Sequence, residues 1–161
     1  MLTFTNARVF DGSAMLPGTR TVTLDGDRIA SISEKPGGGD AIDLGGMTLM
    51  PGMITGHFHP DFYKFTIGAG VGLGKELPPG VLMAIGVRNS GVLLESGFTG
   101  YVGAACGHDI DASLKIAIAE GIIPGPRIRA CSLHIGTTGD VNDSAQWWRQ
   151  MTSPGTDIFV D

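Results

Sequence analysis

The sequence predicts an α/β protein, with a small β unit over residues 1–50 and alternating strands and helices over residues 51–161. Two observations predict this class. Short β-rich segments separated by turn residues fill the first part of the chain, whereas later apolar strand-like segments alternate with segments of helical periodicity. Because strand and helix alternate in the second part, we expect its strands to be parallel and joined by helical crossovers.

The first unit is expected to be a small antiparallel β structure. The segment TFTNARVF alternates weakly and stops at Asp11-Gly12. The segments RTVTL and RIASIS flank Asp25-Gly26-Asp27, and Asp-Gly between two β-rich runs is a strong hairpin signal. After a loop over residues 36–40, AIDLGGMTLM predicts a further strand with a Gly-Gly break.

The second unit begins with a short apolar strand, MITGHFH, and a Gly-rich loop over residues 66–80. A helix is expected up to Gly97, which suits the position just after a helix end. A strand, FTGYVGAA, and a second helix with Asp111 as N-cap follow. The third strand is PRIRACSLHIG, and the chain ends in a polar loop and a strand-like TDIFVD.

Two histidines, His57 and His59, lie one residue apart at the end of the first strand of this unit. Residues i and i+2 of a strand point to the same face, so the two imidazoles project together and Phe58 turns into the packing on the other side. Two imidazoles at the carboxyl end of a strand can bind a divalent metal, and parallel α/β proteins build their sites at that end. The alternative is a pair of hydrogen-bonded or exposed histidines without a metal.

The stretch DLGGMTLMPGMITGHFHPD resembles the first barrel strand of the amidohydrolase superfamily, whose usual pattern is Pro-Gly, two apolar residues and Asp-x-His-x-His. The segments NARVFDG, GDRIASI and AIDLGG resemble the composite β-sandwich unit that opens many members. Further on, LLESGFTGYVGAA and AIAEGIIPGPRIRA resemble the second strand and the approach to the third in the imidazolonepropionase and prolidase-like branch. One departure is Thr55, which stands where the family usually has Asp; that carboxylate helps to orient metal ligands.

The resemblance implies the N-terminal part of a TIM-like (β/α)8 metal-dependent hydrolase barrel, with about three βα units, preceded by a small β-sandwich-type unit. It implies that His57 and His59 bind a divalent metal, with zinc as the first candidate and one or two ions in the complete site. The metal would activate the water that hydrolyses an amide or related C–N bond, in a non-peptide or dipeptide substrate. The remaining ligands and the catalytic base are expected outside this chain, because a whole barrel takes about 250 residues. The chain alone is therefore expected to be inactive.

The expected partners are a C-terminal half of the same barrel, as a separate chain or as a missing segment, and a small-molecule substrate. The complete enzyme is expected to be a homo-oligomer. Three explanations for the short chain stay open: half of a split or proteolysed amidohydrolase, a fragment of a longer protein, or a freestanding protein without catalysis. The last would make it a metal-binding or scaffold subunit built on a truncated barrel.

Other polar residues are candidates for the same site. His134 ends the predicted third strand and would either point into the mouth of the site, where it could contact substrate, or be a capping or loop histidine. His108 follows the second strand and would either line the site or cap the next helix. The last loop carries expected turn and packing residues, namely Asp140, Asp143, Trp147 and Trp148.

Composition excludes several classes of function. The net charge is −5 with no basic stripe, so a nucleic-acid partner is not expected. No apolar run reaches the roughly 18 residues of a membrane span, and the N-terminus does not have the pattern of a signal peptide, so we expect a cytoplasmic protein. Cys106 and Cys131 are expected to be two reduced, buried thiols. The stretch GAGVGLG, residues 68–74, is not followed by the helix or Lys-Ser/Thr of a phosphate loop.

Overall fold

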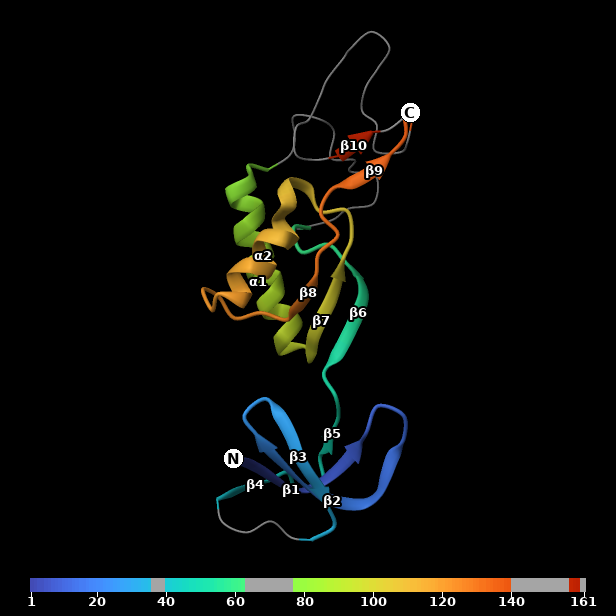
Figure 1. Ribbon diagram of the computed structural model, residues 1–161, viewed down its shortest axis with the longest axis vertical. Coiled ribbons are helices and arrows are strands. Elements are labelled where there is room, and N and C mark those ends of the chain that lie inside the picture. The colour runs from blue at the N-terminus through green and yellow to red at the C-terminus, as the bar shows by residue number, and fades with distance from the viewer. Residues whose placement is uncertain (36–39, 63–76, 140–156, 160–161) are drawn as a thin grey trace. The chain divides into compact units, whose positions relative to one another are not determined.

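A computed structural model describes residues 1–35, 40–62 and 77–139 and the backbone of residues 157–159 (Figure 1). The chain divides into two compact units, Met1–Pro51 and Gly52–Asp161. Among the described residues, the first unit contains strands and no helix, and the second contains strands and helices. The predicted α/β class is thereby confirmed.

The first unit is a five-stranded sheet with the path β3-β2-β1-β4 and with β5 also paired to β1. The strands are β1 (Leu2–Phe10), β2 (Met15–Asp25), β3 (Arg28–Ser33), β4 (Ala41–Asp43) and β5 (Thr48–Leu49). The pairs β1–β2 and β2–β3 are antiparallel, and Asp25 pairs with Arg28 across the predicted Asp-Gly hairpin. Ala7 and Val9 of β1 and Val22 of β2 form a small buried core.

The expectation of a wholly antiparallel unit is wrong for β4 and β5, which both pair parallel to β1. The Gly-Gly break explains how two short strands can follow one edge of β1. Gly45 and Gly46 have φ values of 56° and 82°, which glycine adopts without steric cost. The backbone N–H of Gly46 donates to the carbonyl of Asn6, 2.8 Å away, where β1 is itself irregular.

The second unit contains a three-stranded parallel sheet in the order β6-β7-β8, as the alternation of strands and helices predicts. Its elements are β6 (Met53–Phe58), α1 (Pro79–Glu95), β7 (Phe98–Gly103), the 3-10 turn η1 (Gly107–Asp109), α2 (Ile110–Ala119) and β8 (Arg127–Arg129). A further parallel pair joins β9 (His134–Gly136) to β10 (Asp157–Phe159). Helix α1 begins with a proline in its first turn, and Gly97, with φ 86°, follows its end as predicted.

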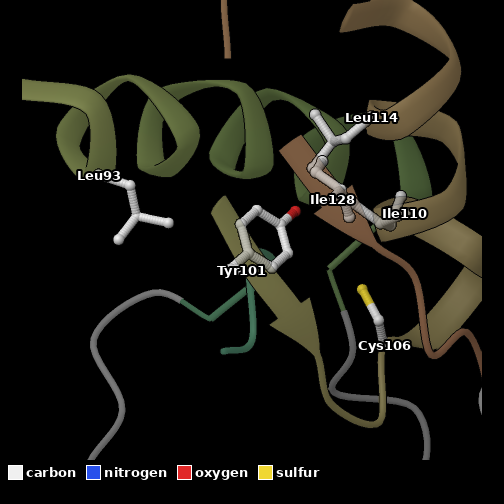
Figure 2. Close-up of a cluster of buried hydrophobic side chains, with 6 residues drawn as sticks. All are labelled: Leu93, Tyr101, Cys106, Ile110, Leu114 and Ile128. Atoms are coloured by element: carbon white, nitrogen blue, oxygen red, sulfur yellow. The ribbon is translucent and has the colours of Figure 1, made fainter. Parts of the chain in front are cut away.

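The core of the second unit lies between the sheet and the two helices, which are on one side of it (Figure 1). Six buried residues form this core, as Figure 2 shows: Leu93, Tyr101, Cys106, Ile110, Leu114 and Ile128. The two helices approach closely at Gly86, where a Cβ atom would lie 2.9 Å from the side chain of Leu114. This packing fixes α1 against the sheet that carries the candidate site.

The structure corrects the sequence reading around the third strand. The strand β8 stops at Arg129, and His134 belongs to the separate strand β9, so the expected single strand over residues 126–136 is wrong. The chain turns at Ser132, whose φ is 67°. Asp111 is not the N-cap of α2, because the helix begins at Ile110 and thus already includes Asp111. The N-cap position belongs to Asp109.

The physical reason lies in the Asp111 carboxylate, which is fully buried in the first turn of α2. Its Oδ2 atom accepts hydrogen bonds from the backbone N–H groups of Cys131 and Ser132, at 2.7 and 3.1 Å. These bonds draw the chain away from the strand direction. The same turn leaves Cys131 exposed, so only Cys106 is the buried thiol that was expected.

No helix in the described part of the chain is long and apolar enough to cross a membrane. Several expectations concern residues outside the described ranges, namely the glycine-rich stretch 68–74, Asp140, Asp143, Trp147 and Trp148.

Candidate metal centre

The histidine pair lies at the carboxyl end of β6, with His57 in the strand and His59 just after its last residue. The two side chains converge, with 3.1 Å between their Nε2 atoms and 5.0 Å between their ring centroids. Phe58 faces the core instead, where its ring packs edge-on against Tyr101 at 5.0 Å. The alternation of a strand thus places both imidazoles together and turns Phe58 away, as the sequence indicates.

The spacing of the two imidazole nitrogens fits a shared metal ion. With Zn–N bonds of about 2.0–2.1 Å and tetrahedral angles, two nitrogen ligands would be about 3.3–3.4 Å apart. The distance of 3.1 Å between the Nε2 atoms of His57 and His59 is close to this value. It equally allows a hydrogen bond from one neutral imidazole to the other.

The donor set is incomplete in the part of the chain that the structure describes. No group of three or more His, Cys, Asp or Glu side chains there could hold a metal ion. A catalytic zinc usually has three protein ligands. The described residues therefore fit two ligands of a metal site and not the whole of one.

Thr55 contacts the backbone of His57 and not its ring. Its hydroxyl donates to the carbonyl oxygen of His57 at 3.2 Å and accepts from the backbone N–H of the same residue at 3.5 Å. Thr55 thus supports the strand end, but it does not orient the imidazole in the way that a carboxylate bound to a ring N–H would.

The turn after the pair is held by a residue that sequence reasoning missed. The side-chain Nδ2 of Asn89, on α1, donates to the carbonyl oxygens of Pro60 and Phe62 at 2.8 and 2.9 Å. The backbone N–H of Phe62 donates to the carbonyl of His59, 3.3 Å away. No local signal identifies this contact, because Asn89 lies 29 residues beyond Pro60 in the chain.

Polar side chains are buried close behind the pair. Asp61 is 9% exposed, and its burial raises the pKa of the carboxyl group, while hydrogen bonding with the Cys106 thiol and the charge of His59 act in the opposite direction. Burial also raises the pKa values of the Cys106 thiol and the Tyr101 hydroxyl. Both groups are therefore neutral at physiological pH in the metal-free chain.

A mostly apolar hollow of about 260 Å³ lies beside His59. It is lined by Phe58, His59, Phe62, Asn89, Val92 and Leu93. The imidazole of His59 stacks on the ring of Phe62, with 4.1 Å between centroids and 10° between planes. An apolar group of a small molecule could be accommodated here next to the histidine pair.

The other two candidate histidines occupy irregular backbone or short strands. His108 is half-buried in η1 with a left-handed φ of 56°. The N-cap position of α2 belongs to Asp109, whose side chain makes no capping hydrogen bond, so His108 is not the N-cap residue. His134 is half-buried in β9, where its backbone is paired with Asp157. Neither histidine joins His57 and His59 in a group of three potential ligands within the described residues.

Comparison of the fold with solved structures gives strong matches. A Xaa-Pro dipeptidase with bound methionine in its active site superposes with a TM-score of 0.82 at 22% sequence identity, covering 99% of this chain and 41% of the other. A prolidase complexed with N-methylphosphonate-L-proline gives a TM-score of 0.82 at 25% identity, covering 99% and 40%. An ochratoxinase of A. niger gives 0.72 at 17% identity, covering 99% and 41%.

The chain thus spans about two fifths of the length of these structures. No protein-family model and no curated protein matches its sequence. The fold agrees with the resemblance drawn from the sequence. The fold of the chain matches the N-terminal part of prolidase and amidohydrolase structures, which is consistent with the amidohydrolase superfamily.

Proposed function

We propose that this chain is the N-terminal part of a metal-dependent amidohydrolase that cleaves an amide or related C–N bond. The observation that carries the proposal is the convergence of His57 and His59, whose Nε2 atoms lie 3.1 Å apart at the carboxyl end of β6. The matched structures include a Xaa-Pro dipeptidase and a prolidase, which supports a dipeptide or N-acyl amino acid as substrate.

In this proposal His57 and His59 are metal ligands, and zinc is the first candidate because imidazole suits it. When bound, the ion would activate water and polarise the scissile carbonyl. The apolar hollow beside His59 would receive a side chain of the substrate. His108 and His134 stay candidates for substrate contact, and the catalytic base is expected outside this chain.

The rest of the site would come from a C-terminal half that completes a (β/α)8 barrel, with the first unit contributing to a β-sandwich. The sheet supports this proposal because, in the described residues, β6 and β8 each pair on one side only, with β7. Apolar side chains near these strands are exposed as well: Ile54 is 72% and Met53 39% exposed. Unpaired edges with exposed apolar residues favour association with further chain. We place the complete enzyme in the cytoplasm, as a homo-oligomer.

The metal site is tested by titrating the chain with Zn²⁺ in competition with a chromophoric chelator. His57→Ala and His59→Ala are each expected to abolish measurable binding, because one imidazole then stands alone. His108→Ala is the matched control and is expected to keep the affinity of the unaltered chain. Equal zinc binding in all four proteins would contradict the proposal.

Activity is tested by adding or fusing a C-terminal half and screening Xaa-Pro dipeptides and N-acyl amino acids. We expect hydrolysis that requires both halves and is lost in His57→Ala. The second candidate function is a metal-binding or scaffold subunit without catalysis, which the incomplete donor set of the described residues favours. Tight zinc binding without hydrolysis by the completed barrel would establish that alternative.

A further inference from the structure

Asn89 connects α1 to the chain segment that carries the histidine pair. It is half-buried on α1 and reaches the turn of residues 60–62, which follows β6 directly. The Asn89 amide joins this turn to the helix by two hydrogen bonds. The second histidine of the pair, His59, immediately precedes this turn.

The geometry uses both hydrogen atoms of one amide nitrogen. Nδ2 donates to the carbonyl oxygen of Pro60 at 2.8 Å and to that of Phe62 at 2.9 Å. The other end of the amide, Oδ1, accepts from Nη1 of Arg88 at 3.2 Å. Two carbonyl acceptors on one side require the NH₂ group there, so the orientation of the carboxamide follows from its partners.

The effect reaches His59 through Phe62. The backbone N–H of Phe62 donates to the carbonyl of His59, and the ring of Phe62 stacks on the imidazole at 4.1 Å. The carbonyl of the same Phe62 is one of the two that Asn89 holds. A displacement of the turn would therefore move both the backbone of His59 and the surface on which its ring lies.

Little else in the described residues orients that ring. Thr55 binds the backbone of His57 only, and the Nδ1 atom of His59 is buried without a hydrogen-bond partner among the described residues. We infer that Asn89 is a positioning residue for the metal-binding histidine pair: by clamping the turn of residues 60–62, it keeps His59 at the distance from His57 that a shared ion requires. This inference rests on the proposed function of the pair.

The test uses the full chain and two readouts, zinc affinity and the ring signals of the histidines in long-range ¹H–¹⁵N spectra without metal. The chain has four histidines, so His108 and His134 serve as internal references for His57 and His59. Asn89→Asp keeps the shape but sets a carboxylate against two carbonyl oxygens, and Asn89→Ala removes the donors without adding charge. The control is Glu95→Gln, an exposed residue on the same helix.

Both Asn89 variants are expected to bind zinc about tenfold more weakly, as residues that orient metal ligands typically do when changed. The ring signals of His57 and His59 should shift, while those of His108 and His134 should stay in place and Glu95→Gln should change nothing. Unchanged zinc affinity and unchanged ring signals in folded variants would overturn the inference. So would a shift of all four histidines, which would make Asn89 a residue of the fold as a whole.

The two ideas fail separately. If the unaltered chain binds no zinc, the proposed function is wrong. The positioning role of Asn89 is then tested by the ring signals of the histidines alone. Selective shifts of His57 and His59 would support that role even then, and their absence would refute it.

Discussion

Replacing Asp111 by asparagine should destabilise the second unit, although the two side chains have nearly the same shape. The carboxylate is fully buried and accepts three backbone hydrogen bonds. Oδ1 accepts from Ala112 at 2.8 Å, and Oδ2 accepts from Cys131 at 2.7 Å and from Ser132 at 3.1 Å. An amide offers only one acceptor atom to these three donors.

The magnitude follows from the better of the two amide orientations. With its oxygen toward Cys131 and Ser132, the amide presents its NH₂ group to the N–H of Ala112, which leaves a buried donor without an acceptor at about 1–3 kcal/mol. The other two bonds lose the charge of their acceptor, at about 1 kcal/mol each. Removing a buried charge offsets part of this cost. The net loss should be about 2–3 kcal/mol, or about 4–12 °C in melting temperature for a chain of this size.

The assay combines urea denaturation with hydrogen exchange at the amides of Cys131 and Ser132. In Asp111→Asn both amides should exchange faster than in the unaltered chain, because their charged acceptor is lost. Glu120→Gln, an exposed change just after the same helix, is the control and should alter neither measurement. A loss below about 0.5 kcal/mol with both amides still protected would refute this reasoning, since surface changes commonly stay within that range.

Four further predictions follow from the packing of the second unit. A Cβ atom at Gly103 would overlap the Asp111 carboxylate and lie 3.1 Å from the backbone nitrogen of Cys131, so Gly103→Ala should cost about 1–3 kcal/mol. Gly91→Ala, in a helix position with nothing within 4 Å, should instead stabilise by about 0.5–1 kcal/mol, and equal melting temperatures of the two variants would contradict the packing argument. Iodoacetamide should label exposed Cys131 and spare buried Cys106 until denaturant is added, and mass spectrometry showing equal labelling of the folded chain would count against the buried position. Burial raises the pKa of the Cys106 thiol above its ordinary 9.0, so just above pH 9 the thiol loses its proton in the unfolded chain and keeps it in the folded chain. The free energy of unfolding should therefore fall as the pH rises above 9, by about 1.4 kcal/mol at about one pH unit above 9. Cys106→Ala should reduce that slope in denaturation series from pH 8 to 10, and an identical slope would rule this explanation out.

Features that depend on a few neighbouring residues could be predicted from the sequence. The Asp25-Gly26 hairpin follows from turn chemistry, and the end of α1 follows from a glycine that takes a positive φ at Gly97. The shared direction of His57 and His59 follows from the period of a strand. In each case the decisive energy acts within a few residues, so the pattern of the sequence reveals it.

Features that depend on distant residues could not be predicted in this way. Asp111 has the composition of a helix cap, yet its carboxylate binds backbone groups 20 and 21 residues away and ends β8 early. The parallel pairing of β4 and β5 depends on how two short segments dock along β1. Asn89 looks like an ordinary polar helix residue until the turn of residues 60–62 is brought to it. Its contribution to the candidate site is a tertiary contact.

The place of β1 in its sheet has a practical consequence for expression of this protein. This first strand pairs with β2 on one side and with both β4 and β5 on the other. Within this sheet, all the remaining strands except β3 therefore depend on β1 directly. Translation that started at the internal Met15 would remove the whole of β1 and leave β4 and β5 without a neighbour. A shortened product of that kind should lose the first unit altogether.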